Sequence, residues 1–294
     1  MYERKIVFDE QGQKIFKYLL RTSNATKVFL HKLFRKNKIY VNHKVAKKDY
    51  VIKKDDVIFC NEIEEKKDPN PIDKPLEIIY HDKNLIVIDK DSQKAIYGEK
   101  DSVVNRLKGY LKKNNNFIVP VHRLDRHTTG VLIFALNYKT ARILTKMFRR
   151  QKVNKIYQTV LQGKILNNLF IEAIIKRDKN ISWAENVKIH NTIPDKSKWL
   201  KANPKKSATI IKPLRVMGNF THSEVEIWTG HHHQIRAICG SINHPVINDT
   251  KYGGKRIGFL EHYILNCKRI EIPLLKIKFE SKKGKLIEEL IEKL

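Results

Sequence analysis

The sequence contains only three cysteines, Cys60, Cys239 and Cys267, and they lie far apart. No Cys-x-x-Cys pair is present, so the sequence offers neither a disulfide framework nor a cysteine zinc site. Such sparse use of cysteine is typical of proteins in a reducing compartment. We therefore expect a cytoplasmic protein.

Long apolar runs are also absent. The longest, residues 131–136, is far shorter than the roughly 20 apolar residues that cross a bilayer. The first ten residues lack the apolar core of a signal peptide. There is no internal repeat and no glycine-rich loop of the kind that cradles phosphates. These absences predict a soluble protein with no membrane partner and no nucleotide cofactor.

Acidic residues are scarce relative to basic ones. The chain has 31 aspartates and glutamates against 59 lysines and arginines, a net charge of +28. Such a balance favours a polyanionic partner, because neutralising phosphates releases counterions. A lysine-rich proteome would also raise the charge, but here the excess is clustered: residues 27–54 hold ten basic residues and one acidic residue. We therefore expect a nucleic-acid partner.

Composition divides the chain into two parts. Residues 12–60 predict a compact helix–helix–strand unit, because apolar residues recur twice at helical spacing and short strand-like pieces follow. Residues 61–75 are charged and carry three prolines, which is typical of a linker. We expect a small domain over 1–60, this linker, and a larger domain over 76–294.

The larger part mixes helices and strands without a regular strand–helix–strand rhythm, which predicts an α+β fold. Ser102 and Asn137 are candidate caps of the first two helices expected. Residues 176–206 have weak periodicity, so we expect an irregular or RNA-facing insertion there. The expected strands are 76–80, 85–88, 156–161, 207–212, 223–228 and 263–267, and the expected helices are 102–112, 138–150 and 285–294.

One motif points to chemistry: His122-Arg123-Leu124-Asp125-Arg126-His127-Thr128-Thr129-Gly130, followed at once by an apolar run. Asp125 lies between Arg123 and Arg126, and opposite charges nearby favour the ionised carboxylate by lowering its pKa. It also lies where a loop would deliver a polar side chain to the edge of a buried strand. By itself, an aspartate between arginines is most often part of a surface salt bridge.

Two pieces that are remote in the sequence accompany this motif. They are Lys155-Ile156-Tyr157, and Thr229-Gly230-His231-His232-His233-Gln234-Ile235-Arg236 followed by His244-Pro245 and Tyr252-Gly253. In this order the three pieces resemble the signature of the RluA-type RNA pseudouridine synthases, in particular the branch, with RluC and RluD, that modifies large-subunit ribosomal RNA. The resemblance spans nearly the whole chain.

The resemblance implies an isomerase built on a mixed, mainly antiparallel sheet flanked by helices. It would break the N1–C1′ bond of a uridine and rejoin the base through C5, with no cofactor. Asp125 would be the catalytic carboxylate, acting as a nucleophile or as a base. Arg236 would be its ion-pair partner, and Tyr157 would offer the uracil a ring face and a hydroxyl. Arg123 would fill the space left by the extruded uridine.

Further contacts follow from the same resemblance. The substrate-binding set would also include His122, Thr128, His233, Gln234 and Ile235. Residues 12–60 resemble an S4 RNA-binding domain, and the residues expected on RNA are Lys27, Lys32, Arg35, Lys36, Lys38, Asn42 and Lys44. The implied partner is a 23S-type ribosomal RNA, bound by a monomer. The S4 unit would add affinity for structured RNA rather than chemistry, because phosphate contacts position an RNA without specifying its sequence.

The triple histidine 231–233 invites a metal interpretation. Adjacent residues on an extended chain point to opposite faces, so three in a row cannot all bind one ion. We therefore expect no metal site and assign His233 the role of orienting its loop. Two departures from the family pattern stand out: His231-His232 replaces Arg-Thr, and Lys90-Asp91-Ser92-Gln93 replaces Lys-Pro-x-Gly.

Two alternatives remain open. One is a non-catalytic S4-type RNA-binding or ribosome-assembly protein that kept the fold, although the joint presence of Asp125, Tyr157 and Arg236 argues against it. The other is a synthase of the same family that acts on transfer RNA. An S4 unit favours ribosomal RNA.

Overall fold

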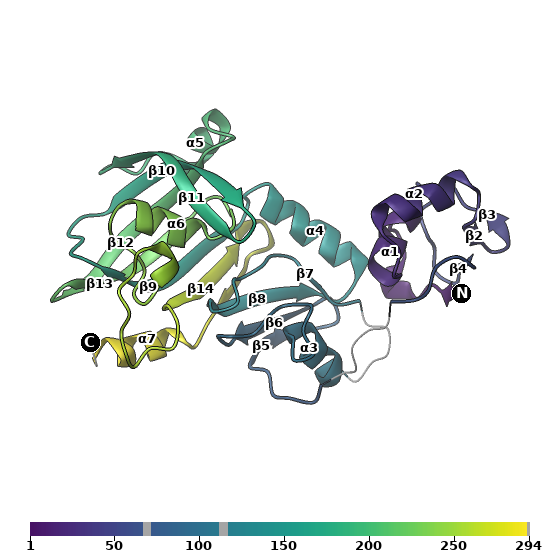
Figure 1. The fold of residues 1–294 in the computed structure, drawn as a ribbon, viewed down its shortest axis with the longest axis horizontal. Coiled ribbons are helices and arrows are strands. Elements are labelled where there is room, and N and C mark those ends of the chain that lie inside the picture. Colours follow the sequence, from purple (N-terminus) through teal and green to yellow (C-terminus); the bar gives the residue numbers. More distant parts are fainter. Residues whose placement is uncertain (67–71, 112–116, 293–294) are drawn as a thin grey trace.

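The computed structural model describes residues 1–66, 72–111 and 117–292. Figure 1 shows a large body built around one extended sheet, with a smaller unit at the N-terminal end. Each has its own cluster of buried apolar side chains. No helix among the described residues is long and apolar enough to cross a membrane.

The smaller unit contains the two helices and short strands expected from the sequence, preceded by an additional strand. Its four strands form one sheet in the order β1-β4-β2-β3. The second helix begins where the hydroxyl of Thr26 accepts a hydrogen bond from the backbone N–H of Phe29 at 3.2 Å. Ile63, beyond the expected end of this unit, still packs in its core. The elements are β1 (Tyr2–Lys5), η1 (Phe8–Glu10), α1 (Ile15–Thr22), α2 (Lys27–Arg35), β2 (Tyr40–Val41), β3 (Lys44–Val45) and β4 (Val57–Cys60).

The large body is built on one sheet, which has eleven strands in the described part of the chain. Nine of its strands follow the order β11-β10-β12-β13-β9-β14-β8-β6-β5, while β15 pairs with β14 and β7 with β8. The strands are β5 (Ile78–His81), β6 (Leu85–Lys90), β7 (Val119–Pro120), β8 (Thr129–Ala135), β9 (Asn154–Gln162), β10 (Leu169–Asp178), β11 (Ile181–His190), β12 (Ser207–Met217), β13 (Phe220–Ile227), β14 (Leu265–Ile272) and β15 (Ile277–Glu280).

The two halves of this sheet meet at β14, which runs parallel to β8 and antiparallel to β9. All other pairings between its named strands are antiparallel. Gly130 faces Cys267 across the parallel pair. It has φ +103°, and a Cβ there would collide with the backbone of Cys267. The motif therefore needs glycine at this position to let the strands close.

Five helices and two 3₁₀ turns accompany the sheet in the described residues, and the predicted α+β class is confirmed. The Asn137 side chain accepts a hydrogen bond from the N–H of Thr140 at 2.9 Å and so begins α4, as expected. Ser102 accepts from Asn105 at 3.4 Å at the start of α3. The elements are α3 (Val103–Leu111), α4 (Tyr138–Arg149), α5 (Lys196–Ala202), α6 (Gln234–Ser241), η2 (Thr250–Tyr252), η3 (Pro273–Leu275) and α7 (Gly284–Ile291). The predicted ends at residues 112 and 293–294 lie outside the described residues.

The expectation of an irregular insertion over 176–206 is wrong. These residues form the end of β10, the whole of β11 and the helix α5. β11 is an edge strand, and most of its side chains are exposed. A strand with so little burial shows no apolar alternation, which is why its sequence carries no strand signal.

The two bodies touch beside α4. The Arg21 guanidinium lies over the ring of Phe117, 4.9 Å from its centroid. After the small unit, the backbone N–H of Lys66 donates to the carbonyl of Thr22 at 2.8 Å. Of the expected linker 61–75, residues 67–71 lie outside the described residues.

Candidate active site

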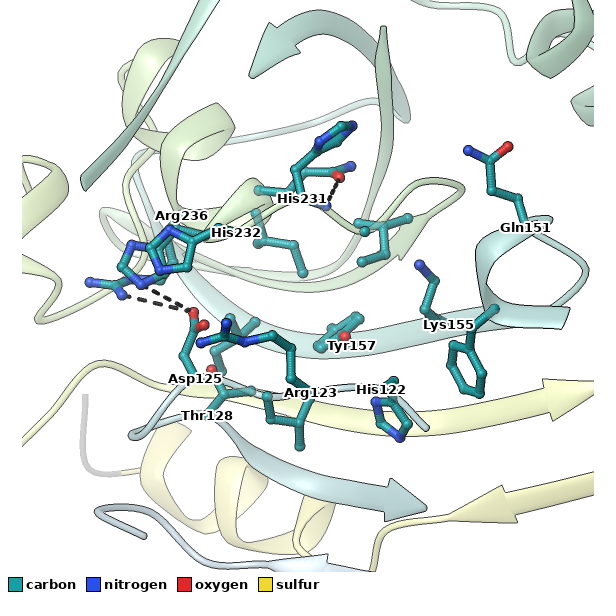
Figure 2. A pocket seen from close by; sticks show the side chains of 18 of the residues that line it. His122, Arg123, Asp125, Thr128, Gln151, Lys155, Tyr157, His231, His232 and Arg236 are labelled. Atoms are coloured by element: carbon teal, nitrogen blue, oxygen red, sulfur yellow. Dashed lines mark hydrogen bonds and ion pairs between the residues drawn. The ribbon is translucent and has the colours of Figure 1, made fainter. Parts of the chain in front are cut away.

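The three motifs singled out in the sequence converge on one cavity of about 570 Å³, within the usual range for ligand pockets. It opens over β9 and is bounded by the loop that precedes β8, the end of α4 and the loop that enters α6 (Figure 2). The pocket thus gathers segments separated by more than a hundred positions. Its lining includes Val121, His122, Arg123, Leu124, Asp125, Thr128, Phe148, Lys155, Tyr157, Arg177, Ile227, Gly230, His231, His232, His233, Gln234, Ile235 and Arg236.

Asp125 projects from the loop between β7 and β8. The loop is anchored by the buried side chain of Leu124 and closed by a turn in which the N–H of Thr128 donates to the carbonyl of Asp125 at 3.2 Å. The carboxylate is 18% exposed and points into the pocket (Figure 2). The loop therefore presents one carboxylate at the edge of a buried strand, as predicted.

The environment of Asp125 differs from the expected one in two respects, the position of Arg126 and the direction of the pKa shift. Arg126 is ion-paired with Glu99, away from the carboxylate, and Arg123 is exposed. Burial raises the pKa of Asp125 above its ordinary value of 3.8, although Arg236, Arg123 and Lys90 pull it down. The sequence argument failed because it counted neighbouring charges and omitted the loss of water around the carboxylate.

Arg236 does reach Asp125, but only loosely. Its Nη1 lies 3.9 Å from Asp125 Oδ2. Its two shorter contacts go to Asp249, with Nε at 2.7 Å and Nη2 at 2.8 Å from the two carboxylate oxygens. The guanidinium also lies over the rings of Tyr263 and Tyr252, 4.1 and 4.8 Å from their centroids. The arginine is therefore held rigidly by other groups at the distance of an ion pair from Asp125.

Tyr157 lies on β9 in the pocket lining, with only 7% of its surface exposed. Burial, with Cys267 and Asp125 nearby, raises the pKa of its hydroxyl well above 10, so the phenol stays protonated. Because side chains alternate along a strand, Tyr157 faces the pocket while Gln158 points to the other side of the sheet. The structure thus brings Asp125, Tyr157 and Arg236 to one cavity.

Lys90 was not predicted as a site residue. It ends β6 and is only 1% exposed, yet its ammonium donates to carbonyls of the loop that carries Asp125. The acceptors are Asp125 at 3.3 Å, Arg126 at 2.8 Å, Thr128 at 2.9 Å and Asp91 at 2.9 Å. Burial lowers its pKa to about 7. A lysine two residues after the apolar run 85–88 was the available signal.

The expectation that residues 231–233 are extended is wrong. His233 has φ +54° at the start of α6, which breaks the alternation of side chains. His232 and His233 consequently stack, with ring centroids 3.7 Å apart. Burial and the nearby arginines lower their pKa values to about 4 and about 3, so both imidazoles are neutral near pH 7. These two rings and Asp125 are the described side chains whose ligand atoms lie close enough together to hold a metal ion.

The other predicted substrate contacts all line the pocket, and His233 Nε2 lies 3.7 Å from Asp125 Oδ2. Three of them are also tied to the surrounding structure. His122 stacks on Phe148 and accepts from the N–H of Ile133 at 3.2 Å. Thr128 is buried and lies 3.5 Å from the Tyr263 hydroxyl. Gln234 accepts from Thr229 and His231 and donates to Ala208 and Thr209.

The basic residues predicted to bind RNA lie away from this pocket, in the small unit. All of them are exposed on or next to α2 and the β2–β3 hairpin. Asn42 differs from the rest, because its amide donates to Asp56 at 2.8 Å and accepts from the N–H of Val57 at 2.8 Å. Its side chain thus holds the hairpin to β4. The remaining positions are Lys27, Lys32, Arg35, Lys36, Lys38 and Lys44.

Comparison with known proteins agrees with this geometry. The family model described as RNA pseudouridylate synthase matches residues 71–241. The ribosomal large subunit pseudouridine synthase D of Borreliella burgdorferi is 35% identical over 62% of this chain, and the match spans 56% of that relative. The ribosomal large subunit pseudouridine synthase C of Haemophilus influenzae is 27% identical over 94% of this chain and 86% of its own.

Two further matches extend the comparison. An uncharacterized RNA pseudouridine synthase of Mycoplasma capricolum is 28% identical and spans 95% of this chain and 94% of its own. Among solved structures, human RNA pseudouridylate synthase domain containing 1 has a TM-score of 0.54 at 22% identity, over 70% of this chain and 81% of that one. That likeness concerns the fold alone.

Proposed function

This chain belongs to the RNA pseudouridylate synthase family and isomerises uridines in RNA to pseudouridine, and we propose that Asp125 is the carboxylate on which the reaction depends. The single observation that carries this assignment is the meeting of three groups in one pocket. The Asp125 carboxylate lies 3.9 Å from Arg236, and Tyr157 lines the same cavity. These groups come from three separate segments of the chain.

Each of these three side chains has a role in the cleavage and rejoining of the bond between uracil and ribose. Breaking the N1–C1′ bond leaves an electron-poor sugar carbon and a detached uracil. An ionised Asp125 acts on the sugar as a nucleophile or as a base. Arg236 keeps that carboxylate charged and oriented. The Tyr157 ring lines the pocket and supports the uracil while it turns.

The target uridine must leave its stack to reach this pocket, at a cost of a few kcal/mol. Arg123 is exposed beside Asp125 at the pocket, so its guanidinium can enter the space that the base leaves (Figure 2). A planar guanidinium stacks on neighbouring bases and pairs with phosphates. We assign to Arg123 this role in base extrusion.

We assign RNA binding and catalysis to different domains of the chain. Residues 1–60 form an S4-like RNA-binding domain, residues 61–75 a linker, and residues 76–294 the catalytic domain. The exposed cations of α2 contact phosphates and so add affinity and position the RNA without selecting the uridine. The expectations of a cytoplasmic monomer remain predictions.

For the substrate we propose large-subunit ribosomal RNA. The relatives from Borreliella burgdorferi and Haemophilus influenzae are named ribosomal large subunit pseudouridine synthases, and the basic small unit suits a structured RNA. Transfer RNA is the alternative substrate.

Two experiments test these assignments. Asp125→Asn should abolish pseudouridine formation in vitro while the affinity for RNA stays close to that of the unchanged protein. Activity in this variant would refute the catalytic role. Pseudouridine mapping in cells that lack the protein should reveal a missing site in large-subunit ribosomal RNA. A loss confined to transfer RNA would overturn the substrate assignment.

A further inference from the structure

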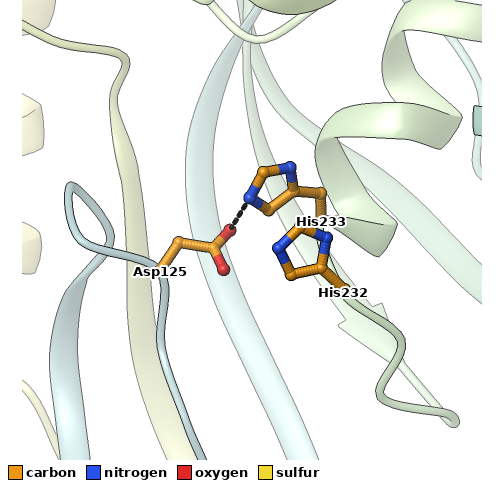
Figure 3. A group of neighbouring side chains, drawn as sticks. All are labelled: Asp125, His232 and His233. Atoms are coloured by element: carbon orange, nitrogen blue, oxygen red, sulfur yellow. Dashed lines mark ion pairs between the residues drawn. The ribbon is translucent and has the colours of Figure 1, made fainter. Parts of the chain in front are cut away.

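A cluster of three side chains at the pocket has a chemistry that the isomerisation does not use. Asp125, His232 and His233 are each half-buried and offer ligand atoms within 4.8 Å of one another (Figure 3). The two imidazole planes lie 21° apart, and His233 Nε2 is 3.7 Å from Asp125 Oδ2. His232 has no part in the reaction proposed above.

Both histidines are held by their Nδ1 atoms. His232 Nδ1 lies 3.0 Å from the hydroxyl of Ser182, and His233 Nδ1 lies 2.8 Å from the hydroxyl of Tyr252. The two hydroxyl-bearing residues are themselves joined, because the N–H of Ser182 donates to the Tyr252 oxygen at 3.1 Å. The Nε2 atoms are therefore left for the side of Asp125 (Figure 3). Metal-bound histidines are commonly oriented in this way, through a hydrogen bond at the other ring nitrogen.

We propose that Asp125, His232 and His233 bind one divalent transition-metal ion, such as Zn²⁺ or Co²⁺, and that this ion inhibits the enzyme by occupying the carboxylate. Two imidazole nitrogens and one carboxylate oxygen suit such ions, whereas Mg²⁺ and Ca²⁺ prefer oxygen ligands alone. The metal site itself does not depend on the function of Asp125. The inhibition does rest on the proposed function.

The ligand atoms must draw closer together to share one ion. Zn²⁺ binds nitrogen and oxygen at about 2.0–2.2 Å, so tetrahedral ligand atoms lie roughly 3.3–3.6 Å apart. The 3.7 Å between His233 and Asp125 is close to this value, and the three side chains have ligand atoms within 4.8 Å of one another, so one ion requires a shift of His232 towards Asp125. A fourth position stays open to water.

Positively charged side chains near the cluster weaken the binding of a metal ion. Arg236 is engaged by Asp249, while Arg123 and Arg177 are exposed and can turn towards solvent. Their charges oppose a dication, and the protein supplies three ligands where structural zinc sites have four. We therefore expect an exchangeable ion that a chelator removes.

The first test measures binding without activity. The full-length protein, free of a histidine tag and treated with chelator, is titrated with Co²⁺ and followed by its visible absorption. One ion should bind per chain. The spectrum should disappear in Asp125→Asn and His232→Gln and persist in His231→Gln, a matched change at the neighbouring histidine outside the cluster. Ser182→Ala should weaken binding by roughly 10- to 100-fold, since it removes the partner of a ligand.

Two outcomes of the Co²⁺ titration would overturn the proposed metal site. They are no binding to the unchanged protein and an unchanged spectrum in His232→Gln. Thermal melts of the variants confirm that each is folded before the comparison is made.

The second test measures pseudouridine formation with increasing Zn²⁺. The concentration for half-inhibition should rise at least about tenfold in His232→Gln, equivalent to about 1.4 kcal/mol of binding, and not in His231→Gln. If Co²⁺ binds at the cluster but Zn²⁺ does not inhibit, the inhibitory part is refuted. If Asp125→Asn is also active, the failure belongs to the proposed role of Asp125, and the metal site stands.

Discussion

Arg236 is bonded more tightly to Asp249 than to Asp125, the group it is expected to serve. Both contacts to Asp249 are shorter than 3 Å, whereas the separation from Asp125 is 3.9 Å. A cation anchored by one carboxylate can influence a second without forming a tight pair with it. Arg236 thus offsets part of the cost of burying the Asp125 charge and leaves a carboxylate oxygen accessible.

The role of Asp249 as an anchor is testable with Asp249→Asn. Asp249 is 1% exposed, and removing its charge leaves Arg236 buried without a full partner, which costs about 3–5 kcal/mol of stability. We expect a lower melting temperature and a lower kcat. Asp101→Asn serves as control, because it breaks another carboxylate–arginine fork, with Arg106. That variant should be destabilised with kcat retained; an equal fall in kcat would argue that Asp249 acts through stability alone.

The pH dependence of activity should report the ionisation of Asp125. Because burial raises the pKa of this carboxyl, the acidic limb of kcat/KM should have its midpoint above 3.8. Removing a nearby positive charge favours the protonated form, so Arg236→Gln should move the limb to higher pH. Rates measured across the acidic range test this shift. A limb that stays in place would mean that another group controls it.

Asp125 should also reduce the stability of the protein. Its pKa is higher in the folded state, so the folded protein holds a proton there more tightly than the unfolded chain does. The ionised carboxylate therefore costs stability, and the cost grows as pH rises from 3.8 through the folded pKa. We expect Asp125→Asn to melt a few degrees higher at pH 7, with a smaller gain at acidic pH. A lower melting temperature at pH 7 would contradict this.

Lys90 should be required to hold the loop of Asp125. In Lys90→Met, the carbonyls of Asp91, Arg126 and Thr128 lose the ammonium donor, while that of Asp125 keeps the N–H of Thr128; each buried carbonyl left unpaired costs about 1–3 kcal/mol. We expect a marked loss of stability and at least a tenfold fall in kcat, since about 1.4 kcal/mol of lost transition-state stabilisation suffices. Lys206→Met, which removes a pairing with Glu172, is the control and should spare kcat.

The small unit should contribute salt-dependent affinity. Replacing Lys32, Arg35 and Lys36 with glutamine should reduce the slope of log affinity against log salt by roughly 2–3, if each contacts a phosphate. The matched control replaces Lys198, Lys201 and Lys205, which lie on or after α5 at the other end of the molecule (Figure 1). Equal effects of both triple variants would refute a specific role for α2.

Local patterns predicted local structure, such as the cap of α4 by Asn137. The family resemblance implied that the three remote motifs act together, and they line one pocket. Neither source predicted the individual contacts that depend on long-range packing. The pairing of Arg236 with Asp249 and the burial of Asp125 are of this kind, because neither has a local signature. The stacking of His232 on His233 depends on the positive φ angle of His233. Three consecutive histidines give no sequence signal for such an angle.

The position of β14 between β8 and β9 has a consequence for synthesis of the protein. Strand β14 contains residues 265–272, yet it separates the strands that carry the loop of Asp125 and the ring of Tyr157. The spacing of these two groups is therefore set by a strand that is synthesised after both of the strands it separates. The active site takes its final form only once residues 265–272 have been added to the sheet.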